Sequence, residues 1–538
     1  MNKQAYDYVI VGGGSAGCVL AGRLSENPGI SVCLLEAGNK DNSIFIQAPA
    51  GVAATVPYGF FSWDYDTTAQ KGLNGRKGFQ PRGKVLGGSS SINAMMYIRG
   101  SKWDYDNWAE QGNTGWDYDS ILPYFIKAEN NETIKDEYHG QGGPLNVMEL
   151  RDPSHFNEFF LDACEEHGIP RKADLNGATQ NGCRMNQVTQ KGGERGSAAK
   201  GYLTPNLHRP NLTVITQAHV TKVEIENDIA TGVTFYQGEN LVTVNANKEV
   251  IMSAGAFGSP QILQLSGLGP KDHLEKVGVT VKKDVPGIGC NLQDHISVVP
   301  IYRTKFLLPS KGTLGYSIGG GIDAIKGIFD WAFKRRGLFT SNFAESVGFY
   351  SSDDKVPAPD LELTFIVGVV DDHTRKFHIG HGYCAHATLM RPKSRGTLRL
   401  ASSDPKADPL IDPNYLDHED DMNRLVKGLQ KLLDIMESKY FDKVKGKMIY
   451  PLSRDNIPQL QEYIRDNADT EYHPVGTCKM GPDSDPMAVV DDQLRFKGIA
   501  NLRVVDASIM PTLCTGNTNA PTVMIAEKAA DMIKAATG

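Results

Sequence analysis

Features of extracellular and membrane-spanning proteins are scarce in this chain. No apolar run approaches the roughly 18 consecutive residues that a membrane-spanning helix needs. The eight cysteines lie far apart, with no C-x-x-C pair and no cysteine/histidine set at zinc spacing, so we expect reduced thiols and no metal site. Residues 1–7 enter a strand pattern at once and leave no room for a secretory signal. These absences predict a cytoplasmic protein.

Positive charge is also in short supply. The chain has 56 basic against 63 acidic residues and a net charge of -7, so it lacks the basic field that holds phosphate backbones. We therefore exclude nucleic acid as a partner and expect a small-molecule substrate. A length of 538 residues suits two or three domains, or two domains built from interleaved segments.

One segment leaves contact with a membrane surface open. Residues 322–339 mix isoleucine, phenylalanine and tryptophan with Lys326, Lys334, Arg335 and Arg336. This mixture is typical of an interfacial helix, although a buried amphipathic helix is the commoner explanation. Peripheral attachment to the inner face of the cytoplasmic membrane therefore stays an alternative.

Glycine is abundant, with 56 residues, and its first cluster forms a nucleotide-binding pattern. A β-branched run at residues 8–11 leads into Gly12, Gly14 and Gly17, and apolar residues at helical spacing follow. Gly12 would make the tight turn, Gly14 would let the backbone approach a pyrophosphate, and Gly17 would let helix and strand pack closely. The helix N-terminus would then favour the phosphate charge.

A second apolar run, residues 31–35, ends at Glu36, about 20 residues beyond the glycines. Glu36 can accept hydrogen bonds from ribose hydroxyls. The glycine motif alone would be weak, but strand, turn, helix and distal acid together predict a dinucleotide site. NAD and FAD share this fold, so the pattern leaves the choice between them open.

Further stretches carry a family resemblance. Residues 81–95 read PRGKVLGGSSSINAM, which in isolation is a glycine-rich loop. Together with residues 253–263, this stretch resembles the two sequence signatures of the glucose-methanol-choline (GMC) oxidoreductases. Residues 285–295, 472–481 and 505–521 resemble further parts of the family in the expected order. Within the family the chain looks most similar to bacterial dehydrogenases of aliphatic alcohols and to choline dehydrogenases.

The resemblance implies an α/β fold with a Rossmann-type FAD-binding domain, interleaved with an α+β substrate domain built on an antiparallel sheet. The FAD-binding domain would comprise residues 1–155, 195–300 and 465–538. The substrate domain would comprise residues 156–194 and 301–464.

Carried over position by position, the resemblance also implies which residues contact FAD. Those residues are Gly12, Gly14, Ser15, Ala16, Gly17, Glu36, Ala37, Arg82, Gly87, Gly88, Ser89, Asn93, Ala94, Met95, Val220, Ala254, Gly255, Asp506, Ala507 and Thr518. Relatives with covalently tethered flavin carry a histidine two positions before the arginine that matches Arg82. Here that position is Gln80, which implies non-covalent FAD.

For catalysis the resemblance points to His473 as the general base, with Asn517 beside it. Imidazole suits the task because its unperturbed pKa of about 6.5 lets it accept a proton near neutral pH. Glu345 falls where related dehydrogenases carry a glutamate in the substrate chamber, so we expect it there. A helix over residues 522–533, with Pro521 in its first turn, would point its positive end at the flavin.

These expectations combine into one function and several alternatives. We expect FAD-dependent oxidation of a primary, aliphatic alcohol to the aldehyde by hydride transfer to flavin N5, with electrons passed to a quinone or another carrier. The alternatives are a choline dehydrogenase, an alcohol oxidase that uses oxygen, and a non-redox flavin lyase or decarboxylase of the same family. A flavin-binding module without catalysis is the remaining one.

Overall fold

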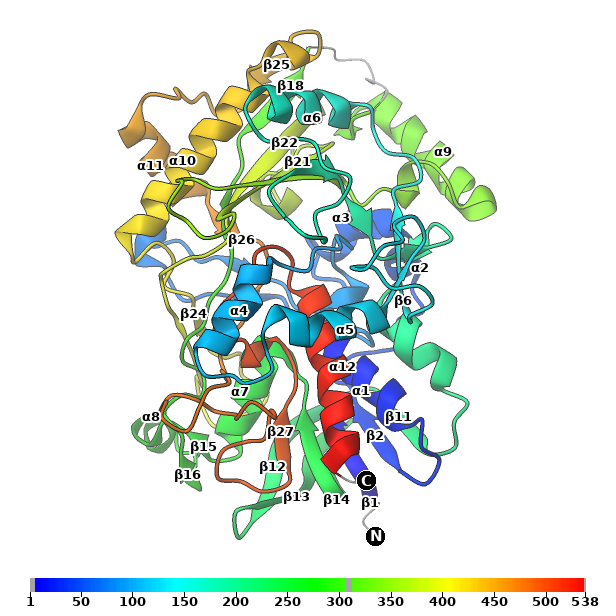
Figure 1. Ribbon diagram of the computed structural model, residues 1–538, viewed down its shortest axis with the longest axis vertical. Helices are drawn as coiled ribbons and strands as arrows, with labels where there is room; N and C mark the ends of the chain where they lie inside the picture. The colour runs from blue at the N-terminus through cyan, green and yellow to red at the C-terminus, as the bar shows by residue number, and fades with distance from the viewer. Residues whose placement is uncertain (1–4, 306–311, 537–538) are drawn as a thin grey trace.

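Two large β-sheets dominate the computed structural model, which describes residues 5–305 and 312–536. In Figure 1 the sheet that contains the N-terminal strand forms the lower half of the molecule, and the second sheet lies in the upper half beneath helices α10 (Glu419–Met436) and α6 (Phe156–Glu166). None of the helices in these two ranges is both long and apolar enough to cross a membrane.

The lower sheet has seven strands within the described residues, and most of them are parallel. Its order is β11 (Leu212–Ile215), β2 (Val32–Leu35), β1 (Ala5–Val11), β14 (Asn240–Met252), β13 (Ile229–Gln237) and β12 (Ala218–Glu226), with β27 (Leu502–Val504) also paired to β14. The strands β11, β2, β1 and β27 and the second half of β14 run parallel, whereas β12, β13 and β14 form an antiparallel meander. A tight turn between Gln237 and Asn240 closes the β13–β14 hairpin.

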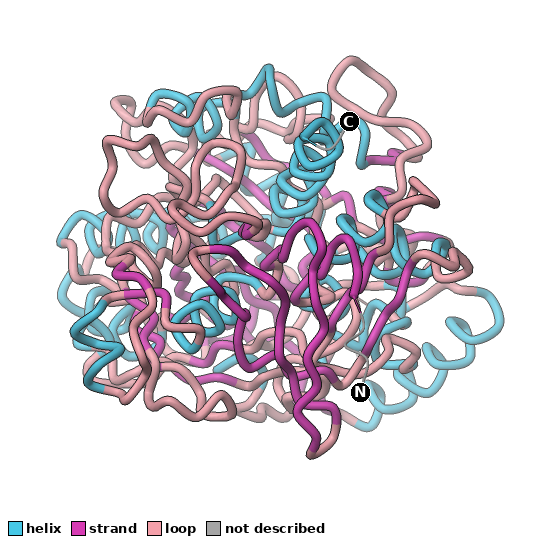
Figure 2. The backbone as a smooth tube through the Cα atoms, turned by 90° about the horizontal axis from the view of Figure 1, so that it is seen from below, coloured by secondary structure: helices cyan, strands magenta, loops and turns pink. Residues whose placement is uncertain are grey.

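The parallel part of this sheet is covered on its faces, which explains its sequence. Every residue of β2 is buried, as expected for a continuous apolar strand between two layers. Helix α1 (Ser15–Leu24) packs against α12 (Asn519–Ala536), and the view from below in Figure 2 shows the C-terminal helix beside the strands. Helix α12 contains the predicted helix over residues 522–533 and confirms it.

The upper sheet is antiparallel and has nine strands in the described parts of the chain. Its order is β25 (Lys445–Met448), β18 (Ile301–Thr304), β22 (Gly380–Leu389), β21 (Leu361–Ile366), β20 (Ala344–Tyr350) and β7 (Gly182–Met185), with β17 (Ile296–Val298), β19 (Gly315–Tyr316) and β26 (Asp469–Thr470) attached. Leu361, Leu363 and Phe365 alternate along β21 and lie in one core cluster with Leu425 and Leu429 of α10. The other face of this sheet is therefore turned toward the lower half.

The remaining elements form the walls around these layers. The other helices are α2 (Ile44–Gln47), α3 (Val52–Thr55), α4 (Lys102–Glu110), α5 (Tyr118–Ala128), α7 (Gly255–Leu265), α8 (Lys271–Lys276), α9 (Ile318–Lys334) and α11 (Ile457–Asn467). The smaller sheets comprise β3 (Tyr65–Asp66), β4 (Phe79–Gln80), β5 (Glu129–Asn131), β6 (Leu145–Glu149), β8 (Gln187–Val188), β9 (Gln190–Lys191), β10 (Glu194–Arg195), β15 (Leu268–Gly269), β16 (Lys283–Asp284), β23 (Thr397–Arg399) and β24 (Leu410–Asp412).

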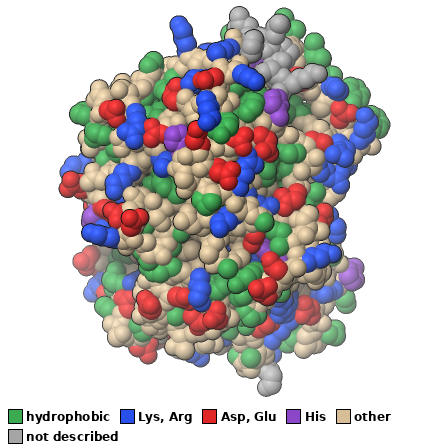
Figure 3. Space-filling view, turned by 45° about the horizontal axis from the view of Figure 1, so that its top comes forward, with side chains coloured by type: hydrophobic (Ala, Val, Ile, Leu, Met, Phe, Trp, Pro, Cys, Tyr) green, Lys and Arg blue, Asp and Glu red, His purple; other side chains and the backbone are tan. Residues whose placement is uncertain are grey.

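The architecture confirms the expected fold class, a mixed α/β half joined to an antiparallel half. Each sheet draws its strands from segments far apart in the sequence, as interleaved domains require; the predicted domain boundaries stay a prediction. On the face in Figure 3, acidic and basic side chains are interspersed, in keeping with a net charge of only -7.

Candidate active site

A cavity of about 1130 Å³ lies between the two halves of the molecule. At one end its wall is the glycine turn after β1, including Gly12, and the tip of β2 at Glu36. At the other end it is lined by Glu362 of β21, His386 of β22 and His473. A single cavity therefore joins the predicted dinucleotide site to the predicted catalytic histidine.

The glycine turn has the close contacts that its sequence predicts. Gly12 has a φ of +100°, and a Cβ on it would lie 2.5 Å from the carbonyl oxygen of Ser253. A Cβ on Gly17 would lie 1.9 Å from the carbonyl oxygen of Gly12, so α1 can approach β1 only with glycine there. Helix α1 begins at Ser15 without a side-chain cap, which leaves its N–H groups and positive end facing the cavity.

Glu36 lies at the tip of β2, as predicted. Its carboxylate accepts hydrogen bonds from the backbone N–H groups of Gly13 at 2.8 Å and Gly38 at 2.7 Å. Burial raises the pKa of Glu36 to about 7, although the two N–H donors act in the opposite direction. A carboxylate offers about four acceptor positions, so Glu36 retains capacity for ribose hydroxyls.

Most of the residues predicted to contact the cofactor line this cavity. They are Gly12, Gly14, Ser15, Ala16, Glu36, Ala37, Arg82, Gly88, Ser89, Asn93, Ala94, Met95, Val220, Ala254, Gly255, Asp506, Ala507 and Thr518. Gly17 and Gly87 lie behind the wall instead, and Gly87 supports the turn by donating its N–H to the carbonyl oxygen of Gly13 at 2.7 Å. Their role is to shape the turn.

His473 is held in a chain of hydrogen bonds that ends at the cavity. His295 Nε2 lies 3.0 Å from the carbonyl oxygen of Met390, His295 Nδ1 lies 2.9 Å from His473 Nδ1, and His473 Nε2 lies 3.2 Å from Asn517 Nδ2. The backbone N–H of His473 also donates to Asp294 Oδ1 at 2.8 Å. The structure thus brings His473 and Asn517 together, as the sequence predicted.

The chain of contacts decides which nitrogen of each ring carries a proton. A carbonyl oxygen only accepts, so His295 Nε2 must be protonated. Burial lowers the pKa of His295 well below its usual value, so its Nδ1 carries no proton and is an acceptor. His473 must then donate from Nδ1, which leaves its Nε2 with a lone pair beside Asn517 in the cavity wall.

The ionisation state of His473 suits a general base that has yet to accept a proton. Burial lowers the pKa of His473 to about 4, and the nearby Glu471 carboxylate only partly offsets this effect. The ring is therefore neutral at pH 7 and can accept a proton. The buried Oδ1 of Asn517 has no hydrogen-bond partner among the described residues, so it remains available to a molecule in the cavity.

The structure places Glu345, the predicted substrate residue, in a buried hydrogen-bond network. Glu345 does not line the cavity. Its carboxylate accepts hydrogen bonds from the Ser154 N–H at 2.7 Å, Asn157 Nδ2 at 2.6 Å and Ser341 Oγ at 2.6 Å. Three donors, from the surrounding loops and from α6, hold this side chain in place. The residues around Glu345 in the sequence do not reveal this arrangement.

Several residues of the chamber escaped the sequence analysis. Glu362, His386 and Glu471 line the cavity, and His295 positions the ring of His473. His295 and Glu471 stand within or directly beside stretches that resemble the family, so their position was a usable signal. Glu362 and His386 carried no signal, because alternation along β21 and β22 does not say which face meets a cavity.

Two family models, both described as GMC oxidoreductase, match residues 6–297 and 392–526 of the chain. The chain belongs to the GMC oxidoreductase family. It is an oxidoreductase of the CH–OH group of donors, and the GMC family is FAD-dependent.

Relatives of known name agree with this GMC assignment. The chain is 43% identical to "Alcohol dehydrogenase [acceptor]" from Pseudomonas putida, covering 98% of this chain and 95% of the relative. It is 42% identical to "Oxygen-dependent choline dehydrogenase" from Vibrio vulnificus, with 99% and 94% covered. Among solved structures, pyridoxine 4-oxidase from Mesorbium loti superposes with a TM-score of 0.89 at 32% identity, with 98% and 99% covered.

The GMC cofactor fits the residues present. A Cβ on Gly88 would lie 2.7 Å from Cα of Gly14, so the two glycine loops meet closely beside the cavity. The N-terminal residues Thr518, Asn519 and Thr522 of the α12 region line the same cavity. Two helix N-termini therefore face the space that FAD would occupy, and both favour its negative charge.

Proposed function

We propose that this GMC oxidoreductase oxidises a primary aliphatic alcohol to the aldehyde, with His473 as general base, and passes the electrons to a quinone or another carrier. The proposal rests on the His295–His473–Asn517 chain, which leaves Nε2 of His473 unprotonated at the cavity wall. FAD, when bound, supplies the hydride acceptor. His473 Nε2 takes the hydroxyl proton, and the Asn517 amide holds the alcohol oxygen.

An aliphatic substrate suits the outer part of the chamber. Its apolar lining residues are Leu314, Ile318, Leu338, Phe339, Phe343, Ile366, Val369, Val370, Phe377 and Ile379. Side chains of this kind bind a hydrocarbon chain through burial of apolar surface. The similarity to the alcohol dehydrogenase of Pseudomonas putida supports the same substrate class.

We also propose that FAD is bound without a covalent bond. Gln80 is fully buried, and its Nε2 donates to Asp294 Oδ2 at 3.0 Å and to the Tyr415 hydroxyl at 2.8 Å. An amide held in this way is no nucleophile toward the flavin. Denaturation in acid should release all of the flavin into the supernatant, and flavin that precipitates with the protein would contradict this assignment.

Anaerobic bleaching of the flavin spectrum tests the substrate and the reaction together. The purified holoenzyme is mixed with choline, short and medium 1-alkanols, and aromatic alcohols. We expect bleaching by the alkanols, fast re-oxidation by a quinone analogue and slow re-oxidation by air. Bleaching by choline alone would favour a choline dehydrogenase, fast re-oxidation by air would favour an oxidase, and no bleaching would reject alcohol oxidation.

We propose that the chain contacts the inner face of the cytoplasmic membrane through α9 and its neighbours, defined here as the apolar rim. Helix α9 projects from the upper half in Figure 1. Its apolar side chains are turned outward, with Ile318 89%, Phe329 60% and Phe333 81% exposed. The rim consists of Tyr316, Ile318, Ile322, Ile325, Ile328, Phe329, Phe333, Phe377 and Ile379, all exposed.

The apolar rim has two properties of a membrane-facing surface. Lys326 and Lys334 lie on the same helix and suit anionic headgroups. Ile318, Phe377 and Ile379 also line the cavity, so the rim is continuous with the entrance to the chamber. A monomer rarely exposes so many large apolar side chains together without a partner.

Sedimentation with vesicles tests the rim. The protein should co-sediment with vesicles that contain anionic lipid, and Phe329→Ser together with Phe333→Ser should reduce the bound fraction about tenfold or more, because two aromatic side chains no longer bury apolar surface. Leu241→Ser, which removes a side chain 60% exposed on β14, is the matched control and should bind as the wild type does. Equal binding of all three proteins would contradict the membrane proposal.

A further inference from the structure

The floor of the chamber is polar, although a plain alkanol needs only apolar walls beyond its hydroxyl. Glu362 and Thr364 alternate with the core residues of β21 and line the cavity. Thr364 pairs with His386 across the β21–β22 ladder, so His386 faces the same side. Glu362, Thr364 and His386 therefore form one polar cluster, here called the floor cluster.

Glu362 has acceptor capacity that the protein leaves unused. Its Oε1 accepts a hydrogen bond from Thr364 Oγ1 at 2.6 Å. Its Oε2 is buried and has no hydrogen-bond partner in the described ranges, while the residue as a whole is 5% exposed. Burial raises the pKa of Glu362 to about 7. A buried carboxylate oxygen without a donor is costly and is satisfied best by a ligand.

A second unpaired polar atom lies beside it, on the ring of His386. Its Nδ1 bonds to the Glu471 carboxylate and lies 3.2 Å from Ser297 Oγ. Although burial opposes it, the charge and hydrogen bond of His386 lower the pKa of Glu471 to about 2, so this carboxylate is ionised and holds a proton on Nδ1. The Nε2 atom of the same ring is buried without a hydrogen-bond partner in the described part of the chain.

We propose that Glu362, with His386 beside it, forms a second substrate subsite, in which the Glu362 carboxylate binds a hydrogen-bond donor group carried by the alcohol, either an ammonium or a hydroxyl. The preferred substrate is then an amino alcohol or a diol, whose carbinol lies at His473 while its second polar group lies at the floor cluster. The inference rests on the proposed alcohol oxidation. A quaternary ammonium such as that of choline has no N–H and leaves Glu362 Oε2 unpaired.

The first test compares alcohols of one chain length. Anaerobic bleaching is followed with 1-butanol, 4-amino-1-butanol, 1,4-butanediol and choline. We expect the amino alcohol or the diol to give a kcat/KM about 10- to 100-fold above that of 1-butanol, the size expected for one hydrogen bond to a charged group. Shorter and longer homologues then locate the chain length that spans the two subsites.

The second test removes the charge of Glu362. Glu362→Gln keeps the shape of the side chain and should lower the kcat/KM of the amino alcohol about 10- to 100-fold while changing that of 1-butanol little. Glu527→Gln is the matched control, because Glu527 is a buried carboxylate outside the cavity, and it should keep the preference of the wild type. Calorimetric binding of butylamine to the oxidised holoenzyme, which involves no turnover, should weaken in Glu362→Gln alone.

The outcomes separate this inference from the proposed function. A preference for the amino alcohol that Glu362→Gln abolishes supports an ammonium at the floor cluster, and a preference for the diol that survives this substitution supports a hydroxyl. Rates for 1-butanol equal to those of both bifunctional alcohols, together with an unaltered Glu362→Gln variant, would overturn the subsite and leave alcohol oxidation standing. Bleaching by none of the alcohols would overturn both.

Discussion

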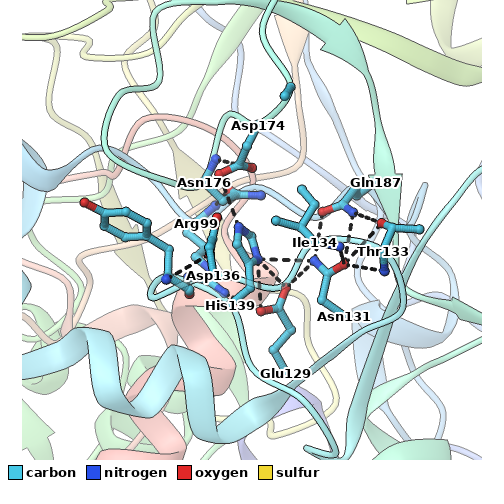
Figure 4. A network of polar contacts seen from close by, with 12 residues as sticks. Arg99, Glu129, Asn131, Thr133, Ile134, Asp136, His139, Asp174, Asn176 and Gln187 are labelled. Atoms are coloured by element: carbon cyan, nitrogen blue, oxygen red, sulfur yellow. Dashed lines mark hydrogen bonds and ion pairs between the residues drawn. The ribbon is translucent and has the colours of Figure 1, made fainter.

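Two histidines of this chain have opposite partners and opposite roles. His473 has a neutral histidine on one side and an amide on the other, whereas His139 lies between the carboxylates of Glu129 and Asp174, with Nδ1 and Nε2 each 3.2 Å from an oxygen. Figure 4 shows His139 at the centre of this network. Although burial opposes it, the bonds to Asp174 and Glu129 raise the pKa of His139 to about 9.

The contrast shows that partners, more than burial, decide what a histidine can do. Both nitrogens of His139 donate to carboxylates, so the ring is a fixed cation, and Glu129 is also paired with the buried Arg99 at 2.6 Å. Asp136 lies near enough to complete a three-residue cluster with His139 and Asp174, but a doubly protonated ring has no lone pair for a metal ion. His139 stabilises the fold, while His473 keeps a lone pair for chemistry.

Removing His473 should give the largest effect on rate. His473→Ala should retain FAD and slow anaerobic flavin reduction by about two to four orders of magnitude, the usual size of a general-base contribution. Stopped-flow absorbance with a saturating alcohol measures it. His208→Ala, which changes an exposed histidine, is the control and should reduce at the wild-type rate. A His473→Ala enzyme as fast as this control would remove His473 from the reaction.

Removing His139 should affect stability instead. His139→Met leaves the carboxylates of Glu129 and Asp174 without their shared cation, and breaking a buried ion pair typically costs about 3–5 kcal/mol. Urea unfolding should show a loss of that order, while the folded fraction should reduce its flavin within about twofold of the wild-type rate, since a variant outside the cavity keeps the base intact. Slow flavin reduction in a His139→Met variant of normal stability would contradict the structural role assigned to His139.

His295 positions the ring of His473, so substitutions of His295 test how far this neighbour controls the reaction rate. His295→Leu removes the acceptor for His473 Nδ1–H and frees the ring to take the other tautomer, which should lower kcat about 10- to 100-fold with little change in KM. His295→Gln offers an amide oxygen to the same proton and should restore most of the rate. Equal losses in both variants would show that His295 matters only for packing.

The smallest expected effect is a difference in how the contributions of the two histidines depend on pH. The pKa of His139 is about 9 in the fold against about 6.5 when unfolded, so its stabilisation is complete below pH 6.5 and is lost as the pH rises through 9. The stability difference between wild type and His139→Met should therefore shrink over this range. Flavin reduction should stay flat down to about pH 5, because the pKa of His473 is about 4. A rate that titrates near pH 7 would contradict this ionisation.

The features that the sequence analysis predicted correctly are those that a short stretch of residues determines by itself. Gly12, Gly17 and Glu36 belong to one strand–turn–helix unit, so a short stretch of the chain contains the geometry. The surroundings of Glu345 could not be predicted in this way, because two of its three donors, Ser154 and Asn157, lie 191 and 188 positions away in sequence. Glu362 and the His295–His473 contact depend on pairing between distant strands and on a separation of 178 positions, which the pattern around either residue does not contain.

Chemical rescue tests the central claim, that His473 Nε2 takes the substrate proton, most directly. Anaerobic flavin reduction in His473→Ala is followed with rising concentrations of imidazole, with His295→Leu as a control that keeps the ring of His473. The account predicts that the rate in His473→Ala rises with the concentration of neutral imidazole and that the control does not respond. A wild-type rate in His473→Ala without imidazole would contradict it.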